Sequence, residues 1–144
     1  MWWWILPLAP GVPEALVVGH EREFLTWFYD KATAKREAIT AEDVDETLRT
    51  FSGREGVLGA MGVYRAAFIS IKQIEPLTKN KVQLPVIALG GIKGLGAKVG
   101  VMVRMIADNV ADVTLDDSSH FVPEERPNAV ARYIELLSNK ISKR

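Results

Sequence analysis

The residues best suited to chemistry lie in one polar stretch, Leu115-Asp-Asp-Ser-Ser-His-Phe-Val-Pro-Glu-Glu-Arg-Pro127. Its histidine, His120, follows an apolar run at 109–115 that is typical of a buried parallel strand. Loops beyond the carboxyl ends of such strands line the ligand crevice of open α/β sheets. An imidazole there can act as a general base near neutral pH. The alternative is a loop histidine that caps a backbone group, and position alone does not separate the two interpretations.

The composition excludes several other kinds of site. The 144 residues include no cysteine, so a disulfide scaffold, a zinc–thiolate site and a cysteine nucleophile are ruled out. With only two histidines, His20 and His120, we expect no metal centre, and His20 reads as a solvated or capping residue at a helix start. The 18 basic and 18 acidic residues give a formal net charge of zero, which attracts neither nucleic acid nor an anionic membrane surface. We therefore expect a soluble, cytoplasmic protein.

The first part of the chain, 1–75, has helical patterns. Apolar residues recur at helical spacing in 21–31, and Thr40 begins a capping-box-like sequence before another amphipathic stretch. Glycines recur in 54–75, which predicts a broken pair of helices rather than one rod.

The second part, 76–144, changes in character. The apolar run at 84–89 predicts a strand that is buried on both faces, and residues 109–115 predict a second buried strand. Helical patterns pass through 99–106 and 130–137. The order strand, helix, strand, helix predicts an α/β fold with a parallel βαβα unit. Two strands are too few for a stable parallel sheet, so the chain reads as part of something larger.

Several stretches together resemble one family. The string Ser119-His-Phe-Val-Pro-Glu-Glu-Arg-Pro127 resembles the histidine loop of α/β-hydrolases of the epoxide hydrolase and haloacid dehalogenase group. The family's cap domain, cap helix and penultimate strand are similar to residues 11–28, 63–68 and 85–91 respectively. The resemblance covers nearly the whole chain and implies a partial α/β-hydrolase fold. In that fold a helical cap segment, 1–75, precedes the last βαβα unit of the core, 76–144.

The resemblance also implies a chemistry. In this family a carboxylate attacks an epoxide carbon, or less often a carbon–halogen carbon of a haloacid, and a histidine activates water to hydrolyse the ester. His120 corresponds to that base. Tyr64 corresponds to the cap tyrosine that hydrogen-bonds to the epoxide oxygen or helps hold the halide, since a phenol can stabilise a developing alkoxide. Without the resemblance, Tyr64 reads as an aromatic residue at the edge of a helical core. Neither a metal nor an organic cofactor is implied.

The chain departs from the family pattern in three respects. It contains no G-x-S-x-G or G-x-D-x-G elbow for the nucleophile, and no clear acid to orient the histidine. Asp116 and Asp117 suit the caps of a turn that ends the strand better than this role. Ser119 stands where the family usually has glycine, and a residue with a Cβ tolerates positive φ poorly. The chain alone is therefore expected to be inactive or nearly so.

A second class of function rests on a glycine-rich loop. Gly94, Gly96 and Gly100 follow a strand and open a helix, and the pair Asp116-Asp117 ends the next strand, as in a dinucleotide-binding fingerprint. Glycines that simply let the loop turn are the more ordinary interpretation.

A third class is non-catalytic. The chain could complement an amino-terminal half supplied by another chain, or a second copy of itself. The adjacent Trp2, Trp3 and Trp4 would then form a mating surface, because large apolar patches mark interfaces. A membrane anchor is the less favoured use of these tryptophans, because no basic residue accompanies them.

Overall fold

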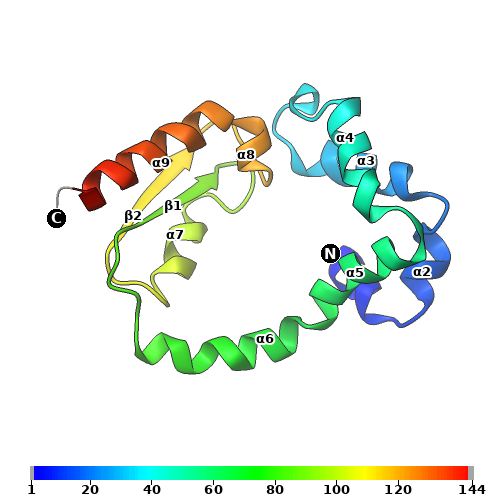
Figure 1. Cartoon of the computed structure of the whole chain (residues 1–144), viewed down its shortest axis with the longest axis horizontal. Helices are drawn as coiled ribbons and strands as arrows, with labels where there is room; N and C mark the ends of the chain where they lie inside the picture. The colour runs from blue at the N-terminus through cyan, green and yellow to red at the C-terminus, as the bar shows by residue number, and fades with distance from the viewer. Residues whose placement is uncertain (1, 143–144) are drawn as a thin grey trace. The chain divides into compact units, whose positions relative to one another are not determined.

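The computed structural model describes residues 2–142, which form two compact units (Figure 1). The first unit comprises 2–29 and 40–75, and the second comprises 30–39 and 76–142. The segment 30–39 thus packs with the carboxyl-terminal unit, although it falls inside the range expected for the helical segment. Residues 1, 143 and 144 of the two expected ranges lie outside the described residues.

The chain is helical as far as residue 79. Its elements are α1 (Trp2–Ile5), the 3-10 helix η1 (Leu6–Leu8), α2 (Val12–Val17), α3 (Glu21–Ala32), η2 (Arg36–Ala38), α4 (Ala41–Phe51), α5 (Gly53–Arg65), α6 (Ala67–Ile74) and η3 (Glu75–Lys79). The expected capping box is confirmed: Thr40 Oγ1 accepts from the Asp43 N–H at 3.3 Å, and the Asp43 carboxylate accepts from the Thr40 N–H at 2.8 Å. The broken helix pair is confirmed as α5 and α6, but the break lies at Ala66. The glycines stay inside α5, because glycine weakens a helix without removing its hydrogen bonds.

The core of the first unit joins α2 to α5. Val17, Val57 and Met61 are buried there, and Phe24 and Phe51 pack against them. The two phenylalanine rings are stacked, with centroids 6.0 Å apart. This core fixes the helix that carries Tyr64.

The tryptophans of α1 are partly covered by side chains of their own unit. The Trp2 ring lies 5.1 Å from Trp27, and Trp4 meets Tyr64 edge-on at 5.4 Å between centroids. Trp2 and Trp4 nevertheless keep 45% and 49% of their surface exposed. An open apolar surface therefore remains on α1.

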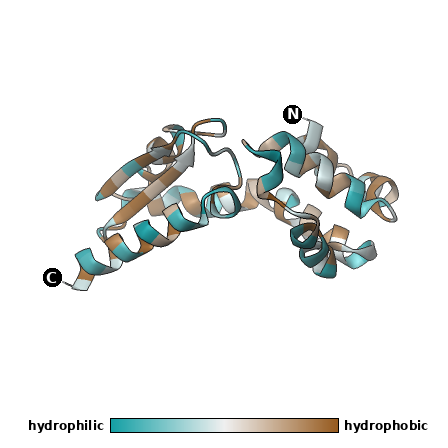
Figure 2. Cartoon of the chain, turned by 90° about the horizontal axis from the view of Figure 1, so that it is seen from above, coloured by the Kyte–Doolittle hydropathy of each residue, from teal (hydrophilic) through white to brown (hydrophobic). Residues whose placement is uncertain are grey.

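The second unit has the expected βαβα order. Its elements are β1 (Val86–Gly91), α7 (Lys98–Val103), β2 (Val110–Leu115), a short helix α8 (Val122–Glu125) and α9 (Pro127–Ser142). The two strands are parallel, and their register pairs Gly91 with Leu115. Figure 2 shows mostly hydrophobic residues along the strands and an alternation of hydrophobic and hydrophilic residues along α9. The predicted α/β fold class is confirmed.

Two expectations about the strands need correction. The first strand begins at Val86 rather than residue 84, because Pro85 has no N–H to donate and the ladder starts with the Val86 N–H to Asn109 O bond at 2.9 Å. Leu84 is 66% exposed. The expected burial is also wrong for β2, whose residues are all half-buried or exposed, since it has only one neighbouring strand among the residues described.

No helix in residues 2–142 is both long and apolar enough to cross a membrane.

Candidate active site

The site is built where β1 and β2 end together. Because Gly91 pairs with Leu115, the loops that follow the two strands leave the same edge of the sheet. Backbone hydrogen bonds join these loops: the Ile92 N–H donates to Leu115 O at 3.0 Å, and the Lys93 N–H donates to Ser118 O at 3.1 Å. The loop that carries His120 is therefore an extension of the parallel ladder.

Two glycines let the loops approach closely. A Cβ at Gly91 would lie 2.5 Å from the Ser118 carbonyl carbon and closer still to Ser119 O. A Cβ at Gly94 would lie 2.9 Å from the Ser119 carbonyl. Only glycine fits at such distances without displacement of the backbone that precedes His120.

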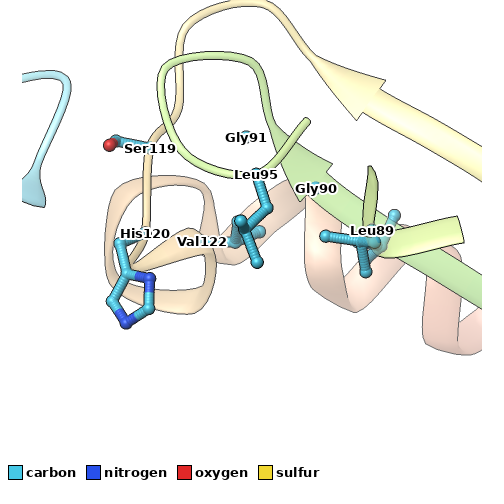
Figure 3. Close-up of a pocket in the computed structure, with 8 residues that line it drawn as sticks. Leu89, Gly90, Gly91, Leu95, Ser119, His120 and Val122 are labelled. Atoms are coloured by element: carbon cyan, nitrogen blue, oxygen red, sulfur yellow. The ribbon is translucent and has the colours of Figure 1, made fainter. Parts of the chain in front are cut away.

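His120 borders an open hollow of about 160 Å³ beside the strand ends. The hollow is lined by Leu89, Gly90, Gly91, Leu95, Val99, Ser119, His120 and Val122. In Figure 3 the side chains of His120, Leu95 and Val122 point to the same side of the loop, and the Ser119 hydroxyl points away from them. The imidazole is exposed, so a water molecule or substrate can reach it.

The backbone around His120 is fixed by hydrogen bonds. The His120 N–H donates to Ala32 O at 3.0 Å, and the Phe121 ring meets the imidazole edge-on with centroids 5.1 Å apart. No non-glycine residue of the described chain has positive φ, so Ser119 fits this loop without the strain that the missing glycine suggested.

Glu125 belongs to the same loop, and the sequence interpretation missed it. It is only 8% exposed, and its Oε2 accepts from the Ser119 N–H at 2.7 Å and from Ser118 Oγ at 3.4 Å. Its Oε1 accepts from the Ala34 N–H. The sequence does place two acidic residues, Glu124 and Glu125, in the first turn of α8 after Pro123. Such a pair by itself indicates only the start of a helix.

The two aspartates after β2 do not serve the imidazole. β2 ends at Leu115, and Asp116 and Asp117 form the turn that follows, as expected. Asp117 is paired with Lys35 at 3.3 Å and with Arg126. Within residues 2–142 no hydrogen bond joins the imidazole of His120 to a carboxylate, so the orienting acid has no candidate here.

Tyr64 lies on α5 in the first unit, and His120 lies in the second. The Tyr64 ring is half-buried against Trp4, and its hydroxyl has no hydrogen-bond partner in the described part of the chain. The phenol can therefore donate to a ligand.

An ion pair next to Tyr64 holds the end of α5. Arg65 donates to the buried Glu14 carboxylate at 2.7 Å and to Pro7 O at 2.7 Å. This hydrogen bond from Arg65 lowers the pKa of Glu14 below its usual range, against the opposing effect of burial. The last turn of α5 is thereby tied to α2 and η1.

The glycines of the dinucleotide-like loop all have structural roles. Gly94 is covered by the backbone at Ser119, and Gly96 has φ +52° in the turn. The side chain of Asp112 occupies the space where a Cβ of Gly100 would lie. These glycines face the protein's own chain, which favours the ordinary interpretation of the loop. The described residues also contain no group of three or more His, Asp or Glu side chains placed to hold a metal.

Comparisons with solved structures identify the fold. The chain is similar to Cfl2 from Burkholderia cenocepacia at 33% identity, with a TM-score of 0.85 over 93% of this chain and 46% of that one. The Cif epoxide hydrolase from Acinetobacter nosocomialis gives 26% identity and a TM-score of 0.85 over 94% and 44% of the two chains. ALR0039 from Nostoc sp PCC 7120, assigned to the α/β hydrolases, gives 28% and 0.83 over 92% and 47%.

No protein-family model matches the chain, and no curated protein matches it. The chain spans about half the length of the solved structures that it resembles. The helices before residue 79, the parallel βαβα unit and the histidine loop together account for that half. The chain therefore has the fold of the carboxyl-terminal half of an α/β-hydrolase, and the structures that it resembles include an epoxide hydrolase.

Proposed function

We propose that the chain supplies the histidine base and the cap tyrosine of an α/β-hydrolase that opens epoxides through a covalent ester. The observation that carries this proposal is the position of His120, exposed beside a hollow at the carboxyl ends of two parallel strands. A general base must reach the water that it activates, and an exposed imidazole on a fixed backbone meets this requirement. The similarity to an epoxide hydrolase supports the substrate class.

The proposed reaction has two steps. A carboxylate forms a bond to one epoxide carbon while the ring C–O bond breaks, and the alkoxide takes a proton from the Tyr64 hydroxyl. Water then attacks the ester carbonyl as His120 takes its proton, and cleavage of the ester releases a diol and the free carboxylate. The proton on His120 returns to Tyr64 through solvent. The net change is the addition of one water molecule to one epoxide.

The nucleophile is proposed to come from polypeptide outside these 144 residues. The sequence has no nucleophile elbow, and no carboxylate of residues 2–142 is hydrogen-bonded to the His120 imidazole. Loss of triad members lowers rates by orders of magnitude, so the chain alone is expected to show little or no turnover.

The partner is proposed to be an amino-terminal half with further strands of the sheet. The sheet described here has two strands, while the similar structures are about twice as long as this chain. Exposed apolar side chains remain on the second unit, including Leu84, Ile92 and Met102. A second copy of the chain is the alternative occupant. Size-exclusion chromatography over a concentration range separates the two, because only self-association gives a concentration-dependent oligomer of the purified chain.

The decisive experiment measures hydrolysis of a simple aryl epoxide. The purified chain and its His120→Ala variant are assayed alone and with a separately expressed amino-terminal half of a similar hydrolase. Two results together support the proposal. Without the added half, the chain and its His120→Ala variant hydrolyse the epoxide at the same background rate. With the added half, turnover appears, is lost in His120→Ala and is reduced in Tyr64→Phe. Turnover that is unchanged in His120→Ala refutes the role of the base. A haloacid assayed in parallel tests the alternative substrate class.

A further inference from the structure

A buried carboxylate lies directly behind the histidine loop. Glu125 is 8% exposed and accepts three hydrogen bonds: from the Ser119 N–H at 2.7 Å, from Ser118 Oγ at 3.4 Å and from the Ala34 N–H. Two of the donors precede His120 immediately, and the third comes from a segment 91 residues away in the sequence. A charged acceptor on backbone N–H groups makes some of the stronger hydrogen bonds in proteins.

The chemistry of these three donors requires a carboxylate. Oε1 faces the N–H of Ala34 and Oε2 faces the N–H of Ser119, so both oxygens must accept. A glutamine has the same shape but one NH2 group, which would face one of the two N–H donors. Glu124, the preceding residue in α8, is exposed and offers a matched position without such contacts.

We propose that Glu125 is a positioning residue for His120, because its carboxylate locks the backbone at Ser118 and Ser119 to residues 32–34. This inference rests on the proposed role of His120 as the base. The His120 N–H is itself bound to Ala32 O at 3.0 Å, so the same short segment helps to hold both peptide groups that flank Ser119. Because the two peptide groups that lead into His120 are held, the direction of its Cα–Cβ bond is restricted. The imidazole then has a small set of staggered positions.

The experiment compares Glu125→Gln with Glu124→Gln in the full chain by NMR. We expect the backbone resonances of Ala34, Ser119 and His120 and the imidazole resonances of His120 to shift in Glu125→Gln only. The amides of Ala34 and Ser119 should exchange about ten-fold faster with solvent, since their acceptor is lost or repelled. Glu124→Gln has the same change of charge and should leave all of these signals unchanged.

A folded Glu125→Gln chain whose His120 imidazole resonances match those of the wild type overturns the inference. If Glu125→Gln does not fold, Glu125→Asp keeps the charge and shortens the side chain. Glu125→Asp should then shift the same backbone resonances, those of Ala34, Ser119 and His120. The absence of these shifts overturns the inference equally.

An activity measurement in the complemented enzyme separates positioning from general stability. A displaced base lowers kcat with little change in KM, and Glu125→Asp should recover part of the loss that Glu125→Gln causes. The NMR readout needs no turnover. The two measurements can therefore give different answers. If Glu125→Gln shifts the imidazole resonances but His120→Ala does not change turnover, the positioning role stands and only the proposed function is refuted.

Discussion

Replacement of Gly91 by alanine should disturb the histidine loop. The new Cβ would lie 2.5 Å from the Ser118 carbonyl carbon. Two carbon atoms in ordinary contact are about 3.5 Å apart, so the backbone at Ser118 and Ser119 must move by about 1 Å. The contact is with backbone on a hydrogen-bonded loop, which cannot rotate away as a long side chain could.

The energetic cost follows from the same geometry. Overpacking of a tightly packed site typically costs about 1–3 kcal/mol, so we expect Gly91→Ala to lower the free energy of unfolding of the second unit by about 2 kcal/mol. The hydrogen bond between the Lys93 N–H and Ser118 O, now 3.1 Å, should weaken in the same variant.

The assay is urea unfolding followed by NMR signals assigned to each unit, with Gly59→Ala as the matched control. Gly59 is exposed within α5, and a Cβ built there meets no side chain and no other segment of the chain within 4 Å. Its replacement should raise stability by about 0.5–1 kcal/mol, as alanine does inside helices. A Gly91→Ala chain as stable as the wild type, with unchanged His120 amide resonances, would contradict the packing described for this loop.

Three further predictions concern the first unit, each measured by its unfolding free energy. Val57→Ala should lower it by about 2–3 kcal/mol, since a fully buried side chain loses two methyl groups and leaves a cavity; a loss below 1 kcal/mol would contradict the packing of this core. Thr40→Ala removes the capping box of α4 and should lower it by about 1 kcal/mol, whereas no change would mean that the cap is frayed in solution. The lowered pKa of Glu14 stabilises the fold above the usual carboxyl range, and this contribution is lost as the pH falls through the folded-state pKa. Arg65→Met should weaken that pH dependence, because it removes the largest of the interactions that lower the pKa of Glu14, and an unchanged dependence would assign it to another group.

Local patterns predicted much of this architecture. The capping box at Thr40 and the turn after β2 depend on residues within a few positions of one another, so their side chains could be assigned roles from spacing alone. The βαβα order followed from apolar runs and glycine-rich breaks in the same way. The limits of β1 were displaced because the ladder with β2, rather than the apolar run, decides where the strand begins and ends.

Contacts between distant parts of the chain could not be predicted. The hydrogen bond of Ala34 with Glu125 joins residues that no local period connects, and the polar sequence of 30–39 gives no sign that it packs with the second unit. For the same reason the burial of Glu125 had no signal, because a glutamate in the first turn of a helix is usually solvent-exposed. At Ser119 the sequence predicted a difficulty that the structure does not show. The family usually has glycine there, but the φ angle of Ser119 in this chain is not positive.

The order of the histidine loop therefore does not depend on the nucleophile. Gly91 and Gly94 pack against its backbone, Glu125 accepts from the Ser119 N–H, and the Ala32 carbonyl binds the His120 N–H. All of these groups belong to the second unit of this chain. A loop whose backbone is already ordered loses little conformational entropy when a partner with the nucleophile binds, so complementation should require association and little refolding of this loop. The backbone amide resonances of Ser118 and Ser119 in the free chain should accordingly resemble those of the complemented enzyme, and a large shift of these amides on association would mean that the partner rearranges this loop.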